Sequence, residues 1–424
     1  MRRFAFVALL YSLTSALPGC ASSGSVRAAE RGEWPALRAS LVAGARRGSL
    51  GGGEARSIAR AVAARELAAA RGDAGLQRVN EARPCADPLE DALERRADAR
   101  PRDAVGARAA YVLVDAGLAR PGRWDATDAH PDGAWRAVAA RALRGSGDGA
   151  RRRQLFLDLD ARVRRAALQA ALDAEDPADA PALLEVVRLD PDGVVRHTAA
   201  AALGRLGGAD VVSALRDRWE TADEPLRAAI AAAWASEASA RAGGRDRLLW
   251  ATSSHAGAAS IAAASALLRF GGRDAGYGAA ALARFLDEDT SDNRILAIRL
   301  SSPADPDLKQ ALRRAAESDD RPVRVAALHR LAYDPTERAA ALAQLGPIAA
   351  GASAEAPDAK SALAELRDRR AVLLLFQDRE HKDPDRRARA AVELAAMGEA
   401  PWAAASLADA DPSVRTRVAC ALLR

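Results

Sequence analysis

A five-residue motif recurs along this chain at a nearly fixed interval. Each copy begins with an aspartate and ends four positions later with an arginine, which follows an apolar or small residue. The copies are Asp132 to Arg136, Asp160 to Arg164, Asp192 to Arg196, Asp223 to Arg227, Asp320 to Arg324, Asp385 to Arg389 and Asp411 to Arg415. The first four arginines are separated by 28, 32 and 31 residues. A period in this range is typical of stacked repeats, in which each unit packs only against its neighbours.

The composition predicts that the stacked units are helical. Hydrophobic residues make up 49% of the chain and aromatic residues only 4%, so alanine supplies much of the apolar share. Alanine is the best helix former, and small side chains let helices approach closely. We find no alternating β-branched run that would predict a strand. The expected fold class is all-α, an α-solenoid of about ten helix pairs.

The clearest unit runs from Asp192 to Glu220 and shows what the motif does locally. Asp192 is placed to cap a helix, because a carboxylate accepts the free N–H groups of the first turn and favours the positive end of the helix dipole. Val195, Ala199 and Leu203 then form an apolar stripe. Gly207 and Gly208 end this helix, and 211–219 is predicted to form its partner.

Less regular copies fill the gaps in the array. Residues 260–271 align with 196–207, so Ser260 stands where the arginine is expected. Further copies are expected around Arg294 and within 358–367. The solenoid is therefore predicted over 104–424, and 34–103 is predicted to be an N-terminal helical cap or divergent repeats, because terminal repeats must cover an open end.

The pattern Asp-x-x-Val-Arg-x-x-Ala-x-x-x-Leu-Gly resembles the short HEAT-like repeat of the phycocyanobilin lyase type. The resemblance implies that the aspartates and arginines of successive repeats form a ladder, in which each arginine reaches a nearby aspartate. The fourteen motif residues are accordingly assigned a structural role rather than a catalytic one.

The N-terminus resembles a bacterial lipoprotein signal. A cationic start is followed by a short apolar run that ends in Leu17-Pro18-Gly19-Cys20. The resemblance implies a signal peptide over 1–19, cleavage between Gly19 and Cys20, and lipidation of Cys20. Residues 20–33 are then a lipidated tether. Because no aspartate follows the cysteine, we favour the outer membrane over the inner membrane.

Cys85 and Cys420 lie near opposite ends of the predicted array. In an extended solenoid they would be farther apart than the ~7 Å Cα separation that a disulfide tolerates. We therefore expect both to be small core residues.

The formal charge of +5 is compatible with binding to an acidic partner. The acidic residues are interleaved with the basic ones, so a mixed solvated surface is favoured over a basic groove. A groove that binds nucleic acid or another polyanion, similar to that of HEAT-like DNA glycosylases, is the alternative. It requires non-motif arginines to converge on one face.

Catalysis is the third hypothesis. The HEAT-type hydroxylases need recurring His-Glu pairs, and none of the five histidines precedes a glutamate. We expect no metal, cofactor or catalytic residues, and neither lyase nor hydroxylase activity. The favoured function is a lipid-anchored, extracytoplasmic scaffold or assembly factor that binds a protein partner.

Overall fold

The computed structural model describes residues 23–254, 257–288 and 290–424. Cys20 and the cleavage site at Gly19 lie outside these residues. The described part is helical, contains no strand, and none of its helices is long and apolar enough to cross a membrane. Short 3₁₀ turns and one π segment, Ala240–Gly244, connect some of the helices. The α-helices are α1 (Ser23–Arg31), α2 (Trp34–Arg47), α3 (Gly52–Ala68), α4 (Gly72–Ala82), α5 (Glu90–Asp98), α6 (Ala104–Asp115), α7 (Gly133–Ala142), α8 (Gly149–Leu155), α9 (Ala161–Ala174), α10 (Ala180–Leu189), α11 (Gly193–Leu206), α12 (Ala209–Trp219), α13 (Glu224–Trp234), α14 (Glu237–Ser239), α15 (Arg245–Ser254), α16 (Ala258–Phe270), α17 (Gly272–Glu288), α18 (Ser291–Leu300), α19 (Pro306–Ala316), α20 (Arg321–Leu331), α21 (Arg338–Ala350), α22 (Ala356–Glu365), α23 (Arg370–Asp378), α24 (Pro384–Ala396), α25 (Ala400–Ala404) and α26 (Pro412–Leu423).

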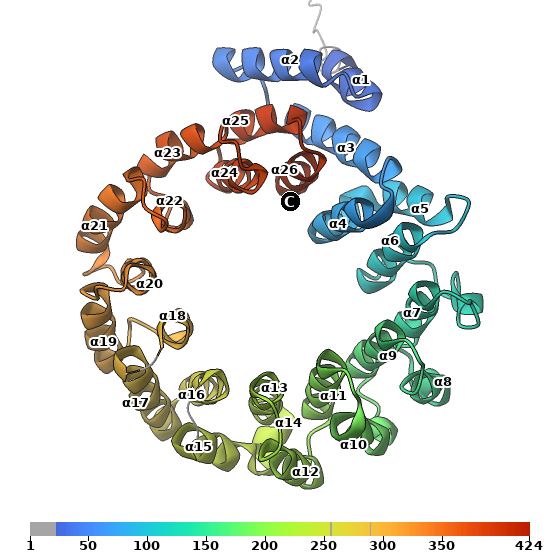
Figure 1. Ribbon diagram of the computed structural model, residues 1–424, viewed down its shortest axis with the longest axis vertical. Helices are drawn as coiled ribbons and strands as arrows, with labels where there is room; N and C mark the ends of the chain where they lie inside the picture. The colour runs from blue at the N-terminus through green and yellow to red at the C-terminus, as the bar shows by residue number, and fades with distance from the viewer. Residues whose placement is uncertain (1–22, 255–256, 289) are drawn as a thin grey trace, which may run out of the picture.

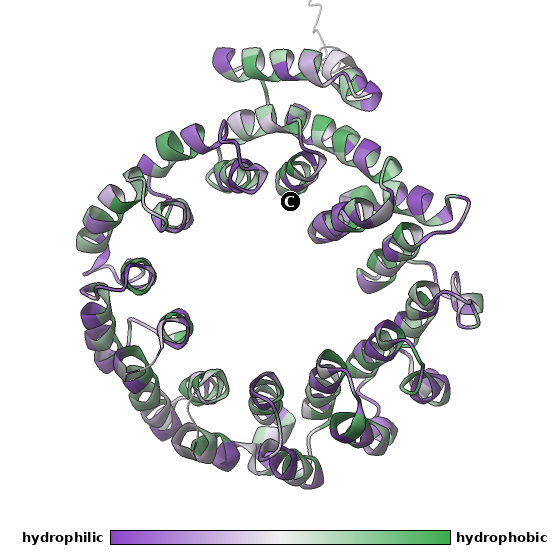
Figure 2. Ribbon diagram, in the orientation of Figure 1, coloured by the Kyte–Doolittle hydropathy of each residue, from purple (hydrophilic) through white to green (hydrophobic). Residues whose placement is uncertain are grey.

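The helix pairs stack into a closed ring (Figure 1). One helix of each pair faces the centre and the other lies outside it, so α11, α13, α16, α18, α20, α22, α24 and α26 belong to an inner layer. Figure 2 shows hydrophobic residues all around the ring rather than gathered in one centre. Each pair therefore buries its apolar stripe against its neighbours, which confirms the predicted all-α solenoid.

Small residues let neighbouring inner helices approach closely. A Cβ atom added to Gly204 of α11 would lie 2.6 Å from the Cα of Ala233 in α13. Larger side chains fill the space between the layers, where Trp219 of α12 stacks on Trp234 at a ring separation of 5.2 Å. Small residues therefore bring inner helices together, and large ones fill the space between the two layers.

Motif aspartates begin many of the inner helices. The carboxylate of Asp192 accepts the backbone N–H of Val195 at 3.0 Å, as the sequence predicts for an N-cap. The other motif aspartates that cap a helix in this way are Asp132, Asp160, Asp223, Asp320 and Asp411.

The motif arginines reach an aspartate that the motif itself does not contain. Arg136 binds both carboxylate oxygens of Asp158 at 2.9 Å, and Arg164 binds both of Asp190 at 2.7 and 2.9 Å. Each of these aspartates stands two residues before the capping aspartate of the next repeat, whose backbone N–H it also accepts. The ladder therefore uses the pattern Asp-x-Asp-x-x-x-Arg. The first aspartate binds the arginine of the preceding repeat, and the second caps the helix of its own repeat.

Where this additional aspartate is missing, the arginine finds another partner. Thr221 stands two residues before Asp223, and Arg196 binds the capping Asp223 itself at 2.9 Å. Arg227 and Arg324 donate to backbone carbonyls of the loop before their own helix. Arginine–aspartate pairs thus join consecutive repeats in some parts of the array and not in others.

The assignment of Asp385 and Arg389 to the ladder was wrong by two residues. Asp383 caps α24, with Pro384 in the first helical position, and Arg387 binds both oxygens of Asp409 at 2.8 and 2.9 Å. Asp383 to Arg387 and Asp385 to Arg389 both have the four-residue spacing, but of the two arginines Arg389 is the one that follows a small residue. Proline in the first helical turn selects the earlier frame.

The two ends of the chain meet and close the ring. Helix α26 packs against α3 and α4, and the hydrophobic core continues from one end of the chain to the other. Arg415, the last motif arginine, binds the carboxylate of Glu66 in α3 at 2.7 Å, and both side chains are buried. Ser413 donates a hydrogen bond to Glu81 of α4.

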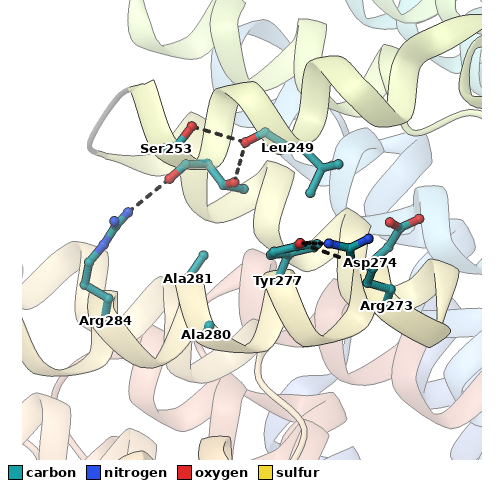
Figure 3. Close-up of a pocket in the computed structure, with 9 residues that line it drawn as sticks. Leu249, Ser253, Arg273, Asp274, Tyr277, Ala280, Ala281 and Arg284 are labelled. Carbon is teal, nitrogen blue, oxygen red and sulfur yellow. Dashed lines mark hydrogen bonds between the residues drawn. The ribbon is translucent and has the colours of Figure 1, made fainter.

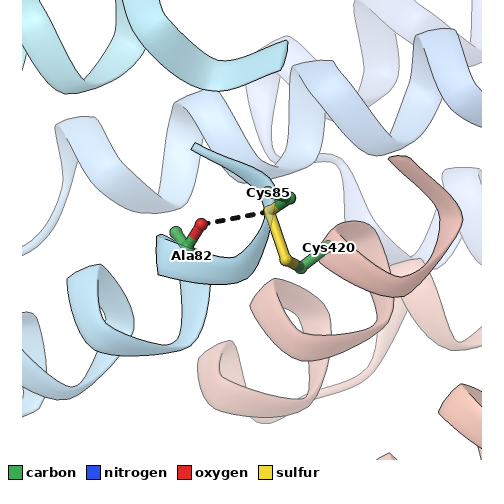
Figure 4. Close-up of a disulfide and its surroundings, with 3 residues drawn as sticks. All are labelled: Ala82, Cys85 and Cys420. Atoms are coloured by element: carbon green, nitrogen blue, oxygen red, sulfur yellow. Dashed lines mark hydrogen bonds between the residues drawn. A yellow bond between two sulfur atoms is a disulfide. The ribbon is translucent and has the colours of Figure 1, made fainter. Parts of the chain in front are cut away.

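A disulfide between Cys85 and Cys420 joins the same two ends (Figure 4). The Cα atoms lie 5.4 Å apart although 335 residues separate the cysteines in sequence. The expectation that both were unpaired core residues was wrong, because it assumed an extended solenoid whose ends never meet.

The N-terminal helices take part in closing the ring. The sequence left two roles open for 34–103, a cap or divergent repeats, and α3 to α5 complete the ring instead of covering an open end. Residues 23–31, predicted to belong to a tether, form helix α1, in which Ala28 and Ala29 are buried. Helix α2 lies outside the ring in Figure 1, and its Arg38 binds both oxygens of Glu380 at 3.0 and 2.9 Å.

The corrected ladder frame predicts unequal effects for two arginines of α24. Arg387→Ala should destabilise the protein by about 3 kcal/mol, because it leaves the largely buried Asp409 without its charged partner. Arg389→Ala removes only an exposed ion pair with Asp358 and should cost less than about 0.5 kcal/mol. Chemical denaturation of both variants measures the difference, and equal losses would contradict the frame.

Candidate functional site

The inner face of the ring is the candidate functional surface. The capping and ladder residues lie at the starts of the inner helices, where they are occupied in holding repeats together. Other positions of the inner helices are not fixed by the motif. In α20 they lie two, five, six and nine residues after the cap, and their side chains line a pocket. Function is therefore sought where these positions form pockets.

One such pocket is formed by α18, α20 and α22, with Arg389 contributed by α24. It has a volume of 490 Å³ and combines apolar residues such as Ile295 and Val325 with a group of titratable side chains. A concave surface with a few convergent polar groups is the usual form of a binding site.

His329 lies between two other polar side chains of this pocket. Its Nε2 atom is 3.2 Å from the Glu365 carboxylate, and its ring is 5.5 Å from the ring of Tyr333. Burial lowers the pKa of His329, and the nearby Arg330 and Arg299 lower it further, although Glu365 opposes the shift. The hydroxyl of Tyr333 lies 3.5 Å from the same Nε2 atom.

Glu393 of α24 is the most perturbed group beside this pocket. The hydroxyl of Ser361 donates a hydrogen bond to its Oε1 atom, and its Oε2 atom is buried without a partner among the described residues. Burial raises the pKa of Glu393 to about 7, although Ser361 and Arg389 act in the opposite direction. The carboxyl group therefore keeps its proton to a higher pH than an exposed glutamate does.

These groups form two separate clusters. His329 lies beside Glu365 and Tyr333, whereas Ser361 donates a hydrogen bond to Glu393. Nucleophilic catalysis needs a nucleophile, a base and an orienting group in one connected chain. The described residues of the pocket do not form such a chain. The arrangement is suited to binding a ligand by hydrogen bonds.

Two further histidines have structural positions. His130 and His381 each stand two residues before a capping aspartate and accept its backbone N–H through Nδ1 at 3.1 Å. They replace the aspartate that occupies this position elsewhere. In the part of the chain that the structure describes, no group of three His, Cys, Asp or Glu side chains could hold a metal ion.

Sequence reasoning missed the pocket residues because they lie on different helices. Ser361 and Glu393 are separated by 32 residues, which is close to one repeat. Residues about one period apart lie near each other on neighbouring inner helices, so the repeat period can predict such contacts. The repeat that contains Ser361 lacks the motif, so the sequence did not show which position of the repeat Ser361 occupies.

Asp385 and Arg389 belong to the inner face rather than to the main ladder. Arg389 donates to Asp358 at 3.3 Å, and Arg417 donates to Asp385 at 2.8 Å. Both pairs join consecutive inner helices, and Arg417 and Asp385 stand six and two residues after their respective caps, Asp411 and Asp383.

A larger pocket of 660 Å³ lies between α15 and α17 (Figure 3). Its polar groups satisfy one another, since Arg273 donates to the hydroxyl of Tyr277 and Arg284 donates to the carbonyl of Thr252. Ser253 likewise donates to the carbonyl of Leu249. Size alone therefore does not make it the stronger candidate.

The raised pKa of Glu393 predicts a pH-dependent stability. The folded state retains a proton that the unfolded state has lost between pH 4.5 and about 7, so stability should fall as the pH rises through this window. The loss attributable to Glu393 is up to about 3 kcal/mol, since one pKa unit corresponds to about 1.4 kcal/mol. Glu393→Gln should remove this part of the slope in denaturation curves recorded across the window. Parallel pH profiles for the two proteins would rule out the assigned titration.

The comparison with protein families agrees with the repeat architecture. Residues 150–235, which run from α8 to the end of α13, match the family described as HEAT repeats. A search among curated proteins gave no match. Among solved structures, an engineered protein from the Northeast Structural Genomics Consortium is similar, with 18% identity, coverage of 81% of this chain and 96% of that chain, and a TM-score of 0.29. The family match and the stacked helix pairs identify the chain as a HEAT-like repeat protein.

Proposed function

We propose that this protein is a non-catalytic scaffold or assembly factor that holds a protein partner on the inner face of its ring. The closure of the ring is the observation that carries the proposal. The Cys85–Cys420 disulfide and the buried Arg415–Glu66 pair fix the two ends to each other. A concave surface held in one shape loses little conformational freedom on binding.

The disulfide also supports an extracytoplasmic location. Disulfides persist in oxidising compartments and are rare in the cytosol. This agrees with the predicted lipoprotein signal, in which Cys20 carries the lipid. We propose that the ring is tethered to the envelope, with the outer membrane favoured.

The distribution of arginines favours a protein partner over nucleic acid. Non-motif arginines lie in outer helices as well as inner ones, and many are paired with carboxylates. Arg313 and Arg314 of α19, for example, bind Glu337 and Asp287. The inner pocket beside His329 contains Asp358 and Glu365 as well as arginines. A continuous basic groove would need unpaired arginines gathered on one face.

Lipidation is tested by Cys20→Ala. The substitution should leave an uncleaved precursor that incorporates no fatty acid, because only the thiol can form the thioether. Metabolic labelling with a fatty-acid analogue, followed by electrophoresis, measures both effects. Normal labelling of the variant would exclude Cys20 as the lipidated residue.

Use of the inner face is tested by site-specific photocrosslinking in the native envelope. A photoreactive benzoylphenylalanine in place of Tyr333, which is 50% exposed in the inner pocket, should give a discrete crosslinked species. The same substitution at Leu373, which is 74% exposed on the outer helix α23, is the matched control and should give none. Mass spectrometry then identifies the partner.

Crosslinks from Leu373 with none from Tyr333 would move the binding surface to the outside of the ring. Adducts that contain nucleic acid would favour the alternative partner.

A further inference from the structure

A second pocket on the inner face has a different chemistry from the pocket beside His329. It has a volume of 340 Å³ and is lined by α4, α6, α7 and α9 together with Arg83, which follows α4. Its polar lining residues are Asn80, Arg83, Arg108, Tyr111, Arg162, Arg165 and Gln169. None of its lining residues is acidic.

Two of the four arginines have no carboxylate partner among the described residues. Arg83 binds Asp115 at 2.6 Å, and Arg162 binds Asp160 at 2.6 Å. Arg108 instead donates to the side-chain oxygen of Asn80 at 2.5 Å, and no ion pair is formed by Arg165. The pocket therefore holds two cationic groups whose charge is not matched locally.

Arg108 is held in this position despite an unfavourable environment. Burial lowers the pKa of Arg108, and Arg83 and Arg165 lower it further, while Tyr111 and Asp115 act in the opposite direction. Arg108 is half-buried, and the more deeply buried Arg164 and Arg415 elsewhere in the ring are matched by carboxylates. A buried charge is stabilised when it gains a partner of opposite sign.

The two carboxamides of the pocket are oriented as donors. Asn80 accepts from Arg108 through its side-chain oxygen, and Gln169 accepts from the hydroxyl of Tyr111. With their oxygens occupied, both amides have NH₂ groups left to donate. Two guanidinium groups and two amide groups thus offer hydrogen-bond donors around one cavity.

The remaining wall of the pocket is apolar. Leu76, Ala107 and Ala137 line it beside the ring of Tyr111, over which the guanidinium of Arg108 lies at 5.1 Å. This wall can receive a small apolar or aromatic group. The cavity volume is at the lower end of the range for small-molecule sites.

We propose that this pocket binds an organic phosphate monoester. The phosphate would lie among Arg108, Arg165, Asn80 and Gln169, and its organic group would lie against Tyr111 and the alanines. A phosphate monoester carries close to two negative charges and three terminal oxygens, which matches two unpaired guanidinium groups and several donors. A carboxylate has one charge and two oxygens and would leave donors unused.

The proposal is tested by calorimetric titration of the purified full chain with phenyl phosphate. We expect a dissociation constant on the order of 1 mM or below. Arg108→Gln should weaken binding about tenfold or more, because it removes a charge-assisted contact. Arg165→Gln should have a similar effect. Since the side chain of Arg165 is exposed, this variant should fold and keeps the test valid if Arg108→Gln fails to fold.

Arg299→Gln is the matched control, because Arg299 is an exposed inner-face arginine in the other pocket. Its affinity for phenyl phosphate should equal that of the unchanged protein.

Inorganic phosphate should bind more weakly than phenyl phosphate because it lacks a group to contact the apolar wall, and equal affinity would overturn the assignment of an organic ester. Benzoate that binds as tightly as phenyl phosphate would overturn the choice of phosphate. Absence of binding, or equal loss in Arg299→Gln, would overturn the site.

Discussion

The ion pair between consecutive repeats sets how one inner helix lies against the next wherever the sequence provides both partners. In its complete form, the guanidinium binds the carboxylate before the next cap, as in the Arg164–Asp190 pair, and also the carbonyls of the loop before its own helix. These bonds fix the position of one inner helix relative to the next. Because each repeat contacts only its neighbours, such local relations accumulate around the array. At the end of the chain, Arg415 makes the same kind of contact with Glu66 of the first ring helix.

The local features of this fold could be predicted from the sequence. Asp192 is recognisable as a cap because the residues after it have helical periodicity. The frame error at Asp385 arose where two aspartates and three arginines crowd into 383–389, so spacing alone did not discriminate. The proline at position 384 was the better criterion, since proline is favoured in the first helical turn.

Closure of the ring could not be predicted by the same reasoning. It depends on small rotations between repeats that add up over the whole array, and no short motif encodes their sum. The separation of Cys85 and Cys420 in sequence indicated distance only on the assumption of an extended shape. Similarly, the hydrogen bond between Ser361 and Glu393 beside the pocket depends on which residues meet across neighbouring helices. The repeat period predicts such neighbours once the register of each helix is known.

The ladder and the closure leave the inner face free to vary from one repeat to the next. The pocket beside His329 is lined by both acidic and basic residues. The pocket beside Arg108 is lined by arginines and by no acidic residue. Both lie on the inner face, so a HEAT-like array can present several chemically distinct sites on one surface. The capping and ladder residues hold the inner helices in place, and none of them is among the described residues that line the two pockets.

The closed ring is tested most directly by peptide mapping of the natively oxidised monomer without reduction. Mass spectrometry should find one peptide that contains Cys85 joined to one that contains Cys420, because a closed ring brings these residues to a Cα separation of 5.4 Å. Recovery of the two peptides unlinked, with both thiols alkylated in the folded oxidised protein, would contradict the account.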